Sequence, residues 1–267
     1  MRFGACIDCN IERAKILKKV GYDYAELNVS KYAQMSDDDF EKFLADIKEV
    51  GIPCEAACIF LPSSLNVSDP HADKEEIKRY LEIAMERSHK LGVQTIVFGS
   101  GKARNIPEDV DIHDGFNALL KFASDLAAPE AEKYGIRIAV EPLYSAACNV
   151  IHTVKEAVAF SKLSKKDNVK ALADIVHMTK ENEDISILDD CGGWIIHSHT
   201  SKPMDGYGLF PTHEDGYDQY PFVKAIYKTG CTRMSIEAKI EDETFETDAA
   251  EGLYTLIDAY DRVLNEN

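Results

Sequence analysis

The chain has no excess of basic residues. Its 30 lysines and arginines are outnumbered by 47 aspartates and glutamates, which gives a formal net charge of −17. A nucleic-acid-binding surface needs a basic face to neutralise phosphates, and anionic membranes attract polybasic segments. The composition therefore argues against nucleic-acid and membrane partners. A strong negative charge is typical of a protein kept in solution by self-repulsion.

Long apolar runs and a disulfide framework are also missing. No stretch approaches the about 20 apolar residues that span a bilayer, and the first residues lack the pattern of a secretory signal. The seven cysteines are odd in number and scattered. Cys6 and Cys9 have CxxC spacing, but no second CxxC follows, so no redox role is predicted. We expect a reduced, cytoplasmic protein.

Short apolar segments alternate with longer amphipathic segments along the whole chain, without a linker or a break in composition. Glycines follow several of the amphipathic segments, as they do at helix ends. The predicted strands are 2–7, 24–29, 54–60, 93–98, 136–140, 169–174, 194–200 and 233–238. The predicted helices are 11–20, 37–50, 73–91, 114–134, 152–163, 185–190, 220–229 and 247–264.

This strict alternation predicts a parallel sheet with helical crossovers. Eight strand–helix units in 267 residues match the size at which such a sheet closes into a (β/α)8 TIM barrel. We therefore expect one domain, 1–267. An open, doubly wound sheet is the rival. It would leave edge strands with polar faces, which we do not find, and the first predicted strand is not followed by GxGxxG.

Polar residues stand at the carboxyl ends of four successive predicted strands. They are Glu141, Asp174, His199 and Glu237. Each alone is compatible with a helix cap or a surface contact, but barrel strands deliver their carboxyl ends to one rim, where active sites lie. Clustered carboxylates are costly unless a cation lies between them. These oxygen and imidazole donors predict one divalent ion, with Mn²⁺ as our first choice and Mg²⁺, Co²⁺ or Zn²⁺ also compatible.

The segments around these residues are AVEPL at 139–143, LADIVHM at 172–178, HSH at 197–199 and SIEA at 235–238. With further matches at 21–26 and 98–104, they resemble the sugar phosphate isomerase/epimerase family. That family has the xylose-isomerase-like barrel and includes ketose 3-epimerases and hydroxypyruvate isomerases. The resemblance covers essentially the whole chain. It implies that the four residues bind the metal, and that Glu141 and Glu237 exchange the substrate proton from opposite sides.

Other residues are candidates for contact with the substrate. By the resemblance, His177 contacts substrate oxygens near the metal, and the others lie at or after strand ends. Arg104 is expected to pair either with a substrate phosphate or carboxylate or with the acidic stretch 108–111. His197 is expected either to support the seventh strand or to be a packed histidine. The candidate substrate-binding residues are His177, Glu26, Asn66, Arg104, Asn149 and Lys202.

Two positions depart from the pattern of ketose 3-epimerases. Ala147 stands where those enzymes usually carry a further glutamate, and Asp205 stands where they usually carry an arginine. Lys202 supplies a nearby positive charge but not a bidentate fork. The departures concern recognition of a free ketose and leave metal-assisted enolisation unaffected.

The predicted function is a sugar isomerase or epimerase that abstracts a proton next to a carbonyl and passes through a metal-stabilised enediolate. The alternative is a lyase subunit that cleaves 3-oxo-glycosides by β-elimination, as in C-glycoside deglycosidases. In that case the aromatic residues Tyr207, Phe210, Tyr217 and Tyr220 would face an aglycone, whereas otherwise they pack on the barrel rim or a partner.

Two other functions are possible in principle. One is a phosphodiesterase like apurinic endonucleases, but those enzymes use many histidines around several zinc ions, and this chain has only eight histidines. The other is a sugar-binding barrel without catalytic activity. We expect a small sugar substrate as the partner. We also expect a homo-oligomer, with a small second subunit in the lyase case.

Overall fold

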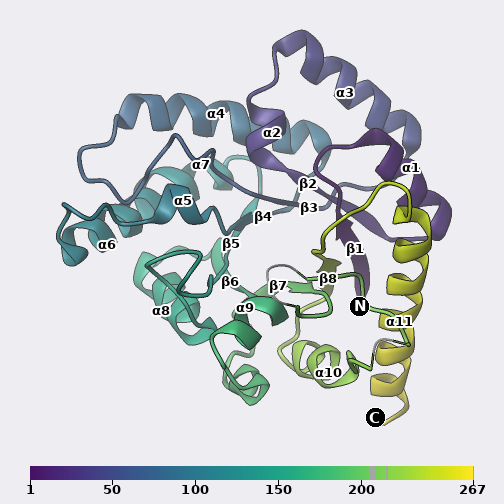
Figure 1. The fold of residues 1–267 in the computed structure, drawn as a ribbon. Coiled ribbons are helices and arrows are strands. Elements are labelled where there is room, and N and C mark those ends of the chain that lie inside the picture. Colours follow the sequence, from purple (N-terminus) through teal and green to yellow (C-terminus); the bar gives the residue numbers. More distant parts are fainter. Residues whose placement is uncertain (205–207, 215, 267) are drawn as a thin grey trace.

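The computed structural model describes residues 1–204, 208–214 and 216–266. Within them, eight parallel strands close into a barrel in sequence order, with β1 paired to β8. The helices surround the strands, and the last helix, α11, lies beside α1 (Figure 1). The predicted TIM barrel is confirmed. The strands are β1 (Arg2–Cys6), β2 (Tyr24–Asn28), β3 (Ala56–Cys58), β4 (Thr95–Phe98), β5 (Arg137–Val140), β6 (Val169–Asp174), β7 (Ile195–Thr200) and β8 (Arg233–Ile236).

The longer helices follow the predicted segments closely. Among the described residues, no helix is both long and apolar enough to cross a membrane. The helices are α1 (Ile11–Val20), α2 (Val29–Ala33), α3 (Asp37–Val50), α4 (Lys74–Leu91), α5 (Gly101–Arg104), α6 (Ile112–Lys121), η1 (Phe122–Ala127, a π-helix), α7 (Ala128–Glu132), α8 (Val154–Ser164), α9 (Ile175–Lys180), η2 (Ile185–Asp190, a 3₁₀-helix), α10 (Tyr220–Lys228) and α11 (Phe245–Asn265).

Two differences from the sequence prediction have local causes. The predicted helix 114–134 is divided into α6, η1 and α7. Pro129 lies in the first turn of α7 and lacks the amide donor that would continue an α-helical ladder. The short helices α2, α5 and α9 were not predicted, because segments of four to six residues show little helical period, although the equally short η2 was predicted over its observed residues. Helices α2 and α9 directly follow β2 and β6, and α5 begins three residues after the end of β4.

Helix α3 illustrates how the sequence produces an outer helix. The Ser36 side chain accepts a hydrogen bond from the Asp39 amide and so caps the first turn. Gly51 ends the helix in the left-handed conformation, at φ +71°. Burial of a large apolar side chain contributes about 1.5–3 kcal/mol, so the inward face stabilises the helix mainly by packing. That face consists of Phe40, Phe43, Leu44 and Ile47.

Two apolar clusters divide the interior. The larger fills the space between strands and helices, and a small one inside the barrel comprises Cys58, Val97, Ala139 and Leu172. At the amino end of the barrel, Arg233 and Arg2 both bind the largely buried carboxylate of Glu55, with N–O distances of 2.8 and 2.6 Å. Along the barrel axis, the side chains inside the barrel are therefore ionic at the amino end and apolar in the middle. The polar side chains of the opposite end form the candidate site.

Candidate functional site

Four side chains converge at the carboxyl end of β5 to β8. Glu141 follows β5, Asp174 ends β6, His199 lies in β7 and Glu237 follows β8. One nitrogen or oxygen atom from each lies within 4.8 Å of those of the others. Three of these residues are buried, and the Glu237 side chain is 40% exposed. The structure thus brings together the four residues that the strand ends singled out.

His199 occupies the centre of the cluster. Its Nδ1 atom lies 2.8 Å from Glu237 Oε2, 3.1 Å from Glu141 Oε1 and 3.8 Å from Asp174 Oδ2. Burial lowers the pKa of this imidazole, but the surrounding carboxylates, Glu26 and Glu237 first, raise it well above its usual value. The carboxylates therefore create a strongly cation-attracting point at Nδ1.

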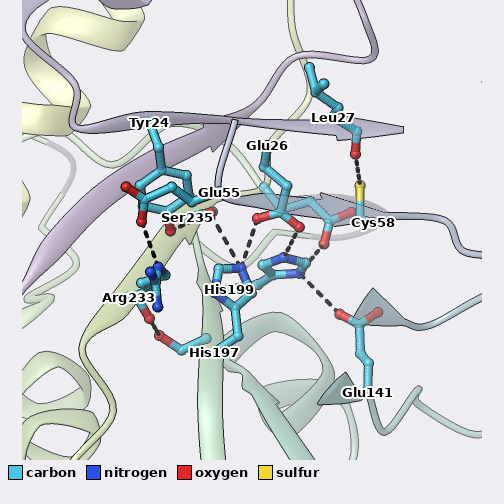
Figure 2. Close-up of polar contacts among 12 residues, drawn as sticks. Tyr24, Glu26, Leu27, Glu55, Cys58, Glu141, His197, His199, Arg233 and Ser235 are labelled. Carbon is cyan, nitrogen blue, oxygen red and sulfur yellow. Dashed lines mark hydrogen bonds and ion pairs between the residues drawn. The ribbon is translucent and has the colours of Figure 1, made fainter. Parts of the chain in front are cut away.

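Glu26 lies beneath His199 and is fully buried. Its carboxylate accepts hydrogen bonds from Nε2 of His199 at 2.9 Å and from Nε2 of His197 at 2.8 Å (Figure 2). Because a carboxylate only accepts, both Nε2 atoms carry protons. Burial raises the pKa of Glu26, but the two histidines outweigh burial and lower it below its ordinary value. We expected Glu26 to line the substrate pocket; instead it fixes the His199 ring with Nδ1 toward the rim.

His197 extends this support towards the interior of the barrel. The Tyr24 hydroxyl shares a 2.8 Å hydrogen bond with Ser235 Oγ, which lies 3.4 Å from His197 Nε2. The His197 ring meets the His199 ring edge to face, with centroids 5.2 Å apart. Of the two expectations for His197, the structure matches the supporting one.

The two carboxylate oxygens of Asp174 have different roles: one caps a helix and the other faces the cluster. Oδ1 accepts hydrogen bonds from the amides of Val176 at 2.6 Å and His177 at 3.0 Å, which caps α9. Oδ2 is left to face His199. Burial, with help from Glu141 and Glu237, raises the pKa of Asp174 to about 6. A cation in the cluster would relieve that cost.

Glu141 reaches the cluster only because residue 99 is glycine. A Cβ atom on Gly99 would lie 1.6 Å from Glu141 Oε2, so any side chain there would displace the carboxylate. Burial raises the pKa of Glu141, but its contact with His199 outweighs burial and lowers it. The close approach of Glu141 explains why residue 99, directly after β4, is glycine.

A cavity of about 530 Å³ opens onto the cluster. His177 lines it, with its ring stacked on Tyr144 at a centroid distance of 5.4 Å. The Lys180 ammonium lies 4.2 Å from the Tyr144 ring centroid. Sequence reasoning missed Tyr144 and Lys180, although each stands three residues after a recognised one. The lining residues are Tyr144, Ala147, Asp174, Val176, His177, Lys180, Gly208, Glu237, Ala238 and Lys239.

Two predicted substrate contacts hold loops together instead. Asn149 accepts a hydrogen bond from the Ile106 amide at 2.9 Å and donates one to the Ile106 carbonyl at 2.8 Å. Asn66 donates to the Asn105 carbonyl at 2.8 Å and accepts from the Ser68 amide at 2.9 Å. Neither lines the cavity described above. Their polar atoms are consumed by backbone groups that would otherwise be unsatisfied.

Arg104 and Lys202 also differ from expectation. Arg104 is fully buried, and its guanidinium donates to the Phe98 carbonyl at 2.7 Å rather than to the acidic stretch 108–111. Burial lowers its pKa. Lys202 pairs its backbone with Leu209, at 2.8 and 3.0 Å, and does not line the cavity.

The aromatic residues after β7 pack on neighbouring helices. Phe210 meets Phe245 edge to face at 5.8 Å, and the Arg262 guanidinium lies 4.3 Å from the Tyr220 ring centroid. Tyr217 packs against the main core. The structure therefore matches packing on the barrel rim. Tyr207 and Asp205, also named in the sequence analysis, lie outside the described residues.

Comparisons with known proteins agree with the barrel fold. The family model for the xylose isomerase-like TIM barrel matches residues 14–258. D-psicose 3-epimerase of Agrobacterium fabrum is 26% identical over 234 residues, covering 80% of this chain and 78% of the relative. A crystal structure of D-psicose 3-epimerase with D-fructose superposes with a TM-score of 0.81 at 19% identity, over 95% of this chain and 97% of that one. A 3-keto-D-glucoside 4-epimerase of E. coli gives a TM-score of 0.77 at 17% identity, over 97% and 99%.

Proposed function

This chain belongs to the xylose isomerase-like TIM barrel family, and we propose that it is a divalent-metal-dependent sugar epimerase or isomerase. The single observation that carries the proposal is the convergence of Glu141, Asp174, His199 and Glu237 at the barrel rim. The similarity to D-psicose 3-epimerase supports a sugar as the substrate.

The donor set fits a divalent cation. Three carboxylates and an imidazole surround one point, and the raised pKa of Asp174 reflects burial of negative charge there. Glu26 holds the proton of His199 on Nε2, which leaves Nδ1 as the ligand atom. Oxygen-rich donors with one imidazole suit Mn²⁺. When bound, the ion would polarise the substrate carbonyl and stabilise negative charge on its oxygen.

The proton transfer is assigned to the two glutamates. They follow β5 and β8, so they approach the cluster from different strands. The lowered pKa of Glu141 keeps it ionised and able to accept a proton. Glu237, with a side chain 40% exposed, lines the cavity directly. One glutamate would take the proton from the carbon next to the carbonyl, and the other would return a proton to the opposite face.

The cavity determines what kind of sugar fits. His177 and Tyr144 form a stacked, polar wall beside Asp174. Ala147 lines the same cavity, at the position where ketose 3-epimerases usually have a glutamate. The substrate end is therefore less polar than in those enzymes. We infer a keto sugar or keto-sugar derivative. The alternative function, a lyase that cleaves 3-oxo-glycosides by β-elimination, is not supported by the aromatic residues. Those that the structure describes pack on helices and do not face the cavity.

The proposal also covers domain organisation, cellular location and oligomeric state. Strands β1 to β8 run from residue 2 to residue 236, which supports a single domain over 1–267. We also propose that the protein acts in the cytoplasm and as a homo-oligomer.

The experiment that tests the function is hydrogen exchange with solvent. Metal-loaded protein is incubated in D₂O with a panel of ketoses and 3-oxo-glycosides, and the products are analysed by NMR. We expect deuterium at a carbon next to the carbonyl of at least one sugar, together with its epimer or isomer. Metal-free protein is the control. Complete metal loading without exchange in any sugar would contradict the proposal.

Replacement of Glu26 tests the support beneath the metal ligands. We expect Glu26→Gln to weaken Mn²⁺ binding about 10–100-fold, because the ring of His199 loses its charged acceptor. Calorimetric or EPR titration of Mn²⁺ measures the affinity. Glu12→Gln, on the exposed face of α1, is the matched control. Equal affinity in a folded Glu26→Gln protein would show that Glu26 does not act through His199.

A further inference from the structure

A pair of thiols lies beside Glu237. Cys6 is the last residue of β1 and Cys58 is the last residue of β3. Their two Sγ atoms and a carboxylate oxygen of Glu237 all lie within 4.8 Å of one another. The same three residues line a cavity of about 260 Å³, so the cluster is accessible from solvent. Figure 2 shows Cys58 next to the histidine–carboxylate network.

This arrangement differs from that of the neighbouring cysteine. Cys9, which forms the CxxC spacing with Cys6, bonds the backbone of Asn28 through Sγ, at 3.4 Å to both N and O. Cys58 Sγ donates a long, 3.5 Å bond to the Leu27 carbonyl. The chemically relevant pair is therefore Cys6 with Cys58, and CxxC spacing does not reveal it.

Strand topology argues against a disulfide between these thiols. Strand β2 lies between β1 and β3. Since adjacent strands are about 4.8 Å apart, the two Cα atoms are separated by roughly 9 Å, beyond the about 7 Å limit of a disulfide.

A bridging cation has the right span instead. Two thiolates on one tetrahedral Zn²⁺, each at about 2.3 Å, are separated by about 3.8 Å. The ligand atoms thus need to close by no more than about 1 Å from their limit of 4.8 Å. Thiolates prefer soft or borderline ions such as Zn²⁺, whereas Mn²⁺ prefers oxygen.

We propose that Cys6, Cys58 and Glu237 form a binding site for one thiophilic divalent cation of the zinc class, distinct from the four-residue cluster but sharing Glu237 with it. Cys6 Sγ also lies within 4.8 Å of a Glu26 oxygen and a His199 nitrogen, so the two sites adjoin. An ion held by the thiols draws Glu237 away from the candidate proton transfer. Zinc is therefore an inhibitor at this site, and this last step rests on the proposed function.

Cadmium titration of metal-free protein tests the binding site without any activity. We expect about one equivalent of Cd²⁺ to produce the ultraviolet charge-transfer absorption of cadmium thiolate. Cys6→Ser and Cys58→Ala should each bind Cd²⁺ at least about tenfold more weakly and lose most of this absorption, since a direct ligand contributes more than an outer-shell partner. Cys9→Ser is the matched control and should keep the full signal. Circular dichroism establishes that each variant is folded.

Three results would overturn the proposal: no thiolate absorption in the unmodified protein, full absorption in both the Cys6 and Cys58 variants, or an equal loss in Cys9→Ser. Mn²⁺ uptake, followed by EPR, separates this site from the candidate active site, because it should persist in Cys6→Ser. Absence of sugar exchange with a normal cadmium signal would contradict the proposed function alone. Zinc that slows exchange equally in Cys6→Ser and unmodified protein would contradict the inhibition.

Discussion

Glu237→Gln is expected to lower kcat about 10²–10⁴-fold, the usual contribution of a positioned general acid or base. The amide keeps the size of the side chain but cannot accept the substrate proton. Because Glu237 also lies 2.8 Å from His199 Nδ1, metal affinity should fall too, so kcat is measured at saturating Mn²⁺. Glu241→Gln, on the same rim and exposed, is the control and should leave kcat unchanged. Full activity in metal-loaded Glu237→Gln would assign the proton to another group.

The two glutamates can be separated by comparing the epimers of one substrate. If each glutamate serves one face, Glu237→Gln should stop solvent exchange from one epimer, and Glu141→Gln should stop it from the other. Each variant should then still exchange the proton of the remaining epimer without converting it. Loss of exchange from both epimers in both metal-loaded variants would contradict this division. Glu141→Gln should weaken metal binding more, since its carboxylate is buried.

Removal of the divalent ion is expected to abolish activity and to lower thermal stability. At a concentration of 100 Kd, the ion would add about 2.7 kcal/mol to the free energy of unfolding. For a chain of this size that corresponds to a rise in Tm of about 5–10 °C. The physical reason is that the ion compensates the clustered carboxylates of Glu141, Asp174 and Glu237. Differential scanning calorimetry with and without Mn²⁺ measures it, and an unchanged Tm at saturating Mn²⁺ would contradict a site there.

The stabilisation by metal should increase with pH. The pKa of Asp174 is raised to about 6 in the folded, metal-free protein. Its contribution to the free energy of unfolding of that form is therefore fully present below the unfolded pKa and is lost as the pH rises through about 6. The raised pKa of His199 acts in the same direction at higher pH. Metal binding must displace these protons. The Tm difference between loaded and metal-free protein should therefore grow from about pH 5 to about pH 8. A difference independent of pH would contradict this linkage.

Polarity at strand ends points to Glu141 and Glu237, because the carboxyl ends of barrel strands meet at one rim. Cys6 and Cys58 end β1 and β3 beside the same cluster, but the predicted strands 2–7 and 54–60 extend past both cysteines, so strand ends read from the sequence do not identify them. Strand-end polarity fails for Asn66 and Asn149, because a residue just after a strand can turn back to bond a loop. For residues within a few positions of a strand end, the sequence therefore does not determine whether the side chain faces the site or a neighbouring loop.

By itself, the sequence determined the eightfold alternation and the positions of the rim residues, because hydrophobic period and strand-end polarity are local properties. Only the tertiary structure decided that Glu26 binds His199, a residue 173 positions away. That contact depends on closure of the barrel, because pairing of β1 with β8 brings β7 within three strands of β2 around the ring. Which inward side chains meet there depends on strand stagger and side-chain volume, and neither is encoded within a single segment.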